Sequence, residues 1–166
     1  MLIAVVDKKW FVILFLFLTL NTFLVSSTSD NSDETILEDF MICRHCGADV
    51  SLSNFLTNKR ASSSLESKNI SLYEKQSVLV QQLENPAKAR YHIVTVNIAF
   101  CAKIYTQWRS SHSWFPGYAW KLCLCPKCST HVGWMFEPIE TAVDTQILPT
   151  EKGFYGLIVS NVLSET

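Results

Sequence analysis

The chain has 166 residues, with 14 basic and 15 acidic side chains and a formal net charge of −1. Its length fits one globular domain behind a short leader. The nearly balanced charge, without a basic stripe, argues against nucleic acid as the main partner, because a phosphate backbone is held by clustered Lys and Arg.

The N-terminal segment has the pattern of a leader. Lys8 and Lys9 precede an apolar run that begins at Trp10, and small residues follow at 26–29. A basic start, a short apolar stretch and small residues are typical of a secretory signal peptide. A membrane anchor is the alternative, but a span needs about 20 apolar residues. We predict a signal peptide over residues 1–27 and a secreted, extracellular protein that has no membrane attachment after cleavage.

Two regions follow the leader. Residues 28–38 are rich in Ser, Asp and Glu and indicate a flexible acidic lead-in. Residues 39–163 form the predicted domain, with a Ser-rich surface loop over 58–68 and a strand over 91–100. Within it, Asn69-Ile-Ser71 is a glycosylation sequon, which is plausible in a secreted protein. The sequon by itself does not decide whether Asn69 is modified.

Four of the six cysteines form two close pairs. Cys43 and Cys46 are one C-x-x-C pair, and Cys125 and Cys128 are the other. Two such turns can place four thiolates tetrahedrally around zinc. Disulfides are the alternative, because secretion favours oxidation. Bonding within a C-x-x-C pair would be strained, so the pattern favours one structural zinc.

The other two cysteines and the nearby histidines have less certain roles. Cys101 and Cys123 could bond to each other or remain buried free thiols, and the sequence does not decide between these. His45 and His131 lie beside the two cysteine pairs, but four thiolates already complete a zinc site. We interpret both histidines as surface or packing residues.

Three of the five tryptophans lie between positions 114 and 134. Apolar residues alternate on both sides of the Cys125–Cys128 turn, which indicates an antiparallel hairpin. Trp120 and Trp134 are nearly equidistant from the turn, so we expect them almost opposite each other on one face. Trp114 would join them from the preceding segment. Indole rings that converge beside polar groups favour a ligand pocket, and burial in an ordinary core is the alternative.

The segments His-Ser-Trp-Phe-Pro-Gly-Tyr-Ala-Trp (112–120) and Cys-x-x-Cys-x-x-His-x-Gly-Trp-x-Phe (125–136) resemble the CULT domain, the thalidomide-binding domain of cereblon. A weaker likeness covers residues 39–163. The resemblance implies an all-β fold of two antiparallel sheets packed at an angle, which is β-tent-like. It also implies that one structural zinc pins the sheets, with Cys43, Cys46, Cys125 and Cys128 as ligands.

The resemblance further implies a three-tryptophan cage. Its ligands would be cyclic imides or uracil-like rings, such as thalidomide-type glutarimides and cyclised C-terminal Asn or Gln of a modified protein. Carried over by position, the walls are Trp114, Trp120 and Trp134, the floor is Phe136, the hydrogen-bonding edge is His112, Ser113 and the backbone amide of Trp114, and a rim residue is Asn85.

We therefore expect a secreted small-ligand-binding module that is not an enzyme and does not assemble with a ubiquitin ligase. One alternative is a zinc-stapled structural or interaction module without a small ligand. A second is an enzyme like the type B methionine sulfoxide reductases, whose fold is similar. That chemistry needs a nucleophilic thiolate in a late strand, and no cysteine follows Cys128.

Overall fold

The computed structural model describes residues 39–164, so the predicted signal peptide and acidic lead-in lie outside the described residues. The elements in chain order are β1 (Phe40–Cys43), β2 (Asp49–Leu52), the 3-10 turn η1 (Ser53–Phe55), β3 (Leu56–Thr57), β4 (Glu66–Leu72), β5 (Lys75–Glu84), β6 (Arg90–Val96), β7 (Tyr118–Leu124), β8 (His131–Pro138), β9 (Phe154–Ile158), the 3-10 turn η2 (Val159–Asn161) and β10 (Val162–Ser164). Across these residues, no helix is both long and apolar enough to cross a bilayer.

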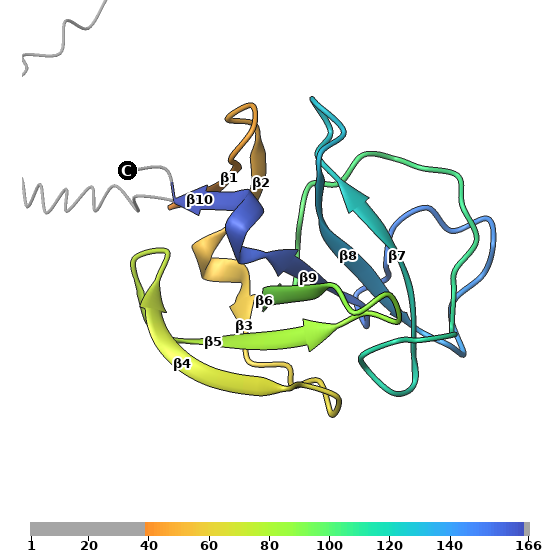
Figure 1. Ribbon diagram of the computed structural model, residues 1–166. Helices are drawn as coiled ribbons and strands as arrows, with labels where there is room; N and C mark the ends of the chain where they lie inside the picture. Colours follow the sequence, from red (N-terminus) through yellow and green to blue (C-terminus); the bar gives the residue numbers. More distant parts are fainter. Residues whose placement is uncertain (1–38, 165–166) are drawn as a thin grey trace, which may run out of the picture. The chain divides into compact units, whose positions relative to one another are not determined.

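The strands form two antiparallel sheets, which confirms the predicted all-β class (Figure 1). The smaller sheet has the order β10-β1-β2, and the larger has the order β4-β5-β6-β9-β8-β7. β3 adds to β6 beyond the point where β5 leaves it. The two ends of the described chain therefore meet in the small sheet, while the segment rich in tryptophan builds one end of the large sheet.

The β7–β8 hairpin is present, but its register differs from the expected one. Trp120 pairs with Phe136, and Trp134 pairs with Leu122. The prediction that the two tryptophans lie almost opposite each other is therefore off by two residues, because they are diagonal neighbours. The connection runs over residues 125–130, and the register shifts between Cys123 and Leu124, which moves the hairpin centre past the Pro-Lys turn. A displacement of two residues preserves the face, so both indoles remain on the same side.

Gly133 is required for the close approach of β8 to β9. A Cβ atom there would collide with the carbonyl oxygen of Gly156 and lie 3.0 Å from the Cα of Leu157. Both obstacles are backbone atoms, which cannot rotate away. We expect Gly133→Ala to lower the free energy of unfolding by at least about 2 kcal/mol, the usual scale of overpacking. Urea unfolding measures this, and an unchanged midpoint would contradict the account.

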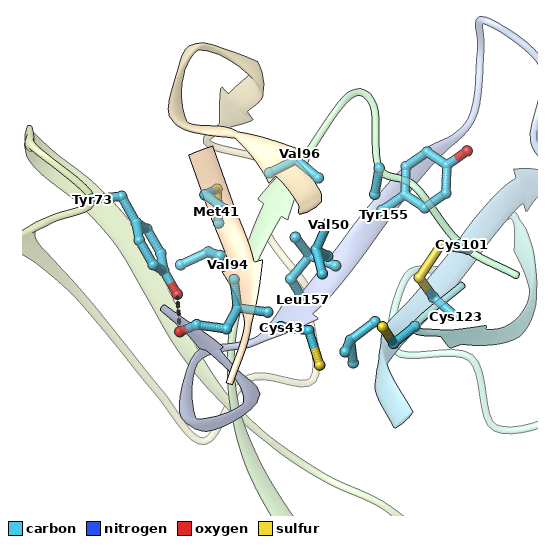
Figure 2. Close-up of a cluster of buried hydrophobic side chains, with 14 of the residues drawn as sticks. Met41, Cys43, Val50, Tyr73, Val94, Val96, Cys101, Cys123, Tyr155 and Leu157 are labelled. Atoms are coloured by element: carbon cyan, nitrogen blue, oxygen red, sulfur yellow. Dashed lines mark hydrogen bonds between the residues drawn. A yellow bond between two sulfur atoms is a disulfide. The ribbon is translucent and has the colours of Figure 1, made fainter. Parts of the chain in front are cut away.

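The buried side chains form two clusters. The first is mainly aliphatic and connects the two sheets, with Met41 and Val50 of the small sheet packed with Val94 and Leu157 of the large one (Figure 2). The second is mainly aromatic and includes Leu83, Ile93, Trp114, Phe115, Trp134, Phe136 and Phe154. Trp114 and Trp134, two of the predicted cage residues, therefore belong to this core, and neighbouring core side chains pack against their rings.

Cys101 and Cys123 form a disulfide, which resolves the alternative that the sequence left open. Figure 2 shows it at one margin of the aliphatic cluster, with Tyr73 at the opposite margin. The backbone N–H of Ala102 also donates to the carbonyl of Leu124 at 2.8 Å. The segment before β7 is therefore fastened to this strand both covalently and by its backbone.

We expect the disulfide to stabilise the folded domain substantially. The bonded cysteines are 22 residues apart. Closing a loop of that size lowers the entropy of the unfolded chain and so raises its free energy by about 3 kcal/mol. A reductant should lower the urea midpoint of the wild type and leave that of the double variant Cys101→Ala, Cys123→Ala unchanged. Equal midpoints for the oxidised wild type and the double variant would show that the bond contributes nothing.

Candidate functional site

The four predicted metal ligands come together. The Sγ atoms of Cys43, Cys46, Cys125 and Cys128 all lie within 4.8 Å of one another. Cys43 Sγ is 3.7 Å from Cys128 Sγ, and Cys46 Sγ is 3.6 Å from Cys125 Sγ. A tetrahedral zinc with Zn–S bonds of about 2.3 Å requires sulfur atoms about 3.8 Å apart. The donor set therefore fits zinc in both chemistry and spacing.

Local backbone geometry turns each thiol pair toward this point. The N–H of Gly47 donates to the carbonyl of Cys43 at 2.9 Å, and Gly47 has a φ of 69°, which an L-residue rarely adopts. The N–H of Ser129 makes the corresponding bond to the carbonyl of Cys125 at 2.9 Å. One pair follows β1 of the small sheet and the other follows β7 of the large sheet. A metal bound here would link the two sheets.

Thr130 prepares one of the thiols for metal binding. Its Oγ1 lies 3.2 Å from Cys128 Sγ. Hydrogen bonding from the side chain and then from the backbone of Thr130 lowers the pKa of Cys128 to about 6. The thiolate is the form that coordinates zinc, so this hydrogen bonding favours the ligand form of Cys128.

The predicted cage borders a cavity of about 340 Å³. The residues that line it are Asn85, Pro86, Tyr91, His112, Trp114, Trp120, Leu122, His131, Trp134 and Phe136. Six of the seven residues predicted to bind a ligand are among them. This volume lies within the range of pockets that hold small molecules.

Hydrogen bonds and ring contacts hold the indoles in place. The rings of Trp114 and Trp134 meet edge to face, with centroids 4.7 Å apart and planes at 77°. Trp114 Nε1 donates to the carbonyl of Glu84 at 2.9 Å, and Trp120 Nε1 donates to the carbonyl of Ser111 at 2.9 Å. Both N–H groups are thus satisfied by the protein, which leaves the apolar ring surfaces to form the walls.

The predicted polar edge is only partly as expected. His112 lines the cavity and has a φ of 59°, a conformation that few L-residues adopt and that often occurs at functional sites. Ser113 does not line the cavity, and its hydroxyl donates to the carbonyl of Phe115 at 3.1 Å. We interpret Ser113 as a residue that shapes the turn. Asn85 lines the rim, and its Oδ1 accepts from the N–H of Ala89 at 2.9 Å.

Comparison with curated proteins finds cereblons. The chain is 39% identical over 72 residues to cereblon of Drosophila persimilis, which covers 43% of this chain and 10% of that protein. It is 35% identical over 94 residues to cereblon of Danio rerio, covering 57% of this chain and 20% of that protein. With cereblon of Drosophila melanogaster it is 28% identical over 157 residues, or 93% of this chain and 23% of that protein.

The chain carries a cereblon-like CULT domain. No family model matches it. It spans between about a tenth and a quarter of the length of these relatives. The cereblon likeness therefore concerns this domain.

Four cavity residues of the cereblon-like domain were not predicted, namely Pro86, Tyr91, Leu122 and His131. Tyr91 meets Trp134 edge to face with centroids 5.0 Å apart. Leu122 shares the strand face of Trp120, so alternation alone could have identified it. Tyr91 comes from β6, and nothing local in its sequence indicates which end of the sheet it faces.

His131 packs against the cage of the cereblon-like domain rather than only near the metal site. Its ring lies edge to face with Trp134 at 4.5 Å between centroids. Its Nε2 is buried and has no hydrogen-bond partner among the described residues. Burial lowers the pKa of His131, so the ring is neutral at pH 7.

Proposed function

We propose that this chain is a secreted small-ligand-binding module whose tryptophan cage takes a neutral cyclic imide or a uracil-like ring. The observation that carries the proposal is the cavity itself. Trp114, Trp120 and Trp134 all line it, and so does Phe136, a residue of the aromatic core. Indole walls of this kind suit a flat ring of modest size, including thalidomide-type glutarimides and cyclised C-terminal Asn or Gln.

The charges around the cavity favour a neutral ring over a cation. None of the described residues that line the cavity is Asp or Glu. Glu84 precedes the cavity residue Asn85 in the sequence, but its carboxylate already forms ion pairs, with Lys88 at 2.9 Å and Arg90 at 3.0 Å. Methylammonium cages gain much of their affinity from aromatic faces and usually add a carboxylate. The missing carboxylate therefore supports the neutral ligand.

Backbone groups could recognise the polar atoms of such a ring. The backbone of His112–Trp114 runs beside the cavity. A cyclic imide carries one N–H between two carbonyls, so it offers both a donor and acceptors.

Further observations support a secreted binding protein rather than an enzyme. In residues 39–164, every cysteine belongs either to the metal cluster or to the Cys101–Cys123 disulfide. A sulfoxide reductase would need an available thiolate beside its pocket. Disulfides persist mainly in oxidising compartments, which agrees with the leader pattern. Under this proposal the chain takes no part in ubiquitin ligase assembly.

Titration followed by tryptophan fluorescence tests the ligand class. Uracil, glutarimide and a trimethylammonium compound are each added to protein that is shown to contain zinc. The proposal predicts a saturable response to uracil or glutarimide and none to the cation. A response to the cation alone would make the cage an ammonium reader. Silence for all three would favour a structural or interaction module.

A further inference from the structure

β4 is an edge strand whose outward face is polar. It is hydrogen-bonded to β5 and to no other strand among the described residues. Ile70 and Leu72 pack against the aliphatic cluster, while Ser67, Asn69 and Ser71 are exposed. The opposite edge of the same sheet is different, because the segment before β7 covers it through hydrogen bonds to Trp120 and Leu124.

The sequon identified in the sequence lies on this edge. Asn69 is the only asparagine of the chain followed two positions later by Ser or Thr, with Ile70 between them. Asn69 and Ser71 are both exposed, and Ser71 lies where the register of β4 with β5 shifts. Asn69 Nδ2 donates to Ser77 Oγ at 3.0 Å. That bond needs one of the two N–H bonds of Nδ2, so the other is free in the folded domain.

We propose that Asn69 carries an N-linked oligosaccharide, an inference that rests on the proposed secretion. Nδ2 forms a bond to the anomeric carbon of a lipid-diphosphate-linked oligosaccharide. The bond from that carbon to the diphosphate oxygen breaks, the lipid diphosphate leaves, and Nδ2 loses one proton. No electron is transferred. The N–H that remains on Nδ2 can still donate to Ser77, so the folded strand accommodates the product.

The glycan has a physical role at this position. An exposed strand edge presents unpaired N–H and C=O groups that can pair with another chain, and proteins commonly protect such edges. A bulky, solvated glycan on β4 would block that pairing. None of the residues that line the cage cavity lies on β4. Removal of the glycan should therefore promote self-association and leave ligand affinity unchanged.

Expression of the full chain in cultured eukaryotic cells tests the proposal. The protein recovered from the medium should lose one oligosaccharide on treatment with a peptide N-glycosidase. Asn69→Gln and Ser71→Ala should migrate like the treated wild type, and Ser71→Thr should keep the glycan. Asn97→Gln is the matched control, because Asn97 is exposed but lies outside any sequon.

Three distinguishable results would overturn the proposal. Protein in the medium that the glycosidase does not shift would leave secretion intact and refute the glycan. Protein retained inside the cell and unmodified would refute both the glycan and the secretion on which it rests. A shift that persists in Asn69→Gln would place the glycan at another residue and also refute the proposal.

Discussion

Replacing Cys128 with serine is expected to unfold the domain. The four thiols link β1 of the small sheet to the β7–β8 hairpin of the large one, and a serine hydroxyl would bind zinc much more weakly than a thiolate. Structural zinc contributes on the order of 10 kcal/mol of folding free energy. That equals the whole stability of a typical domain. Circular dichroism and metal analysis of the purified variant should show lost β structure and lost zinc.

Lys127→Ala is the matched control, because Lys127 is exposed within the same turn and supplies no thiol. It should keep one zinc per chain and the wild-type melting temperature. Removal of metal from the wild type by a chelator should reproduce the Cys128→Ser result. A Cys128→Ser protein that melts like the wild type would rule out a structural metal.

Replacing Trp120 with alanine is expected to weaken ligand binding while the domain stays folded. Trp120 is only partly buried, and the guanidinium carbon of Arg109 lies 5.7 Å from the centroid of its ring. Loss of one stacked ring costs about 1–3 kcal/mol, so the Kd for glutarimide should rise at least about fivefold. Trp134→Ala should weaken binding as well, but it also removes a buried side chain and should lower stability by about 3–5 kcal/mol.

Trp108→Phe provides the comparison for both variants. Trp108 does not line the cage cavity, and its Nε1 donates to the carbonyl of Gln146 at 3.2 Å. Its replacement should leave glutarimide affinity unchanged. If Trp120→Ala bound glutarimide as tightly as the wild type, the ring would not be a wall of the binding site. Calorimetric titration measures all three affinities without relying on tryptophan emission.

Much of the site could be predicted because its signals are local. The C-x-x-C spacing identified the four clustered thiols, and alternation along 118–124 and 131–138 placed Trp120 and Trp134 on one face. Their exact pairing could not be predicted, because a register shift next to the Cys125–Cys128 turn has no signature in residue types. The resemblance to the CULT domain supplied the role of Phe136, which periodicity alone would assign to the core.

The remaining features depend on contacts between distant segments. Tyr91 reaches the cage because β6 and β9 carry it next to the hairpin. The disulfide forms because the segment after β6 crosses to β7, and cysteine spacing cannot reveal that path. Ser113 looked like a ligand group from its neighbours, but its hydroxyl is occupied by the turn. Long-range topology thus decides which polar groups remain free.

The central claim is that the cage recognises a neutral ring through its shape and its imide N–H. Calorimetric titration of the zinc-loaded protein with glutarimide and with N-methylglutarimide tests it most directly. Both rings present the same flat apolar faces, but only glutarimide can donate a hydrogen bond. We predict saturable binding of glutarimide with one site per chain and at least about tenfold weaker binding of the methylated ring, the scale of one lost buried hydrogen bond. Equal affinities, or no binding of either, would contradict the account.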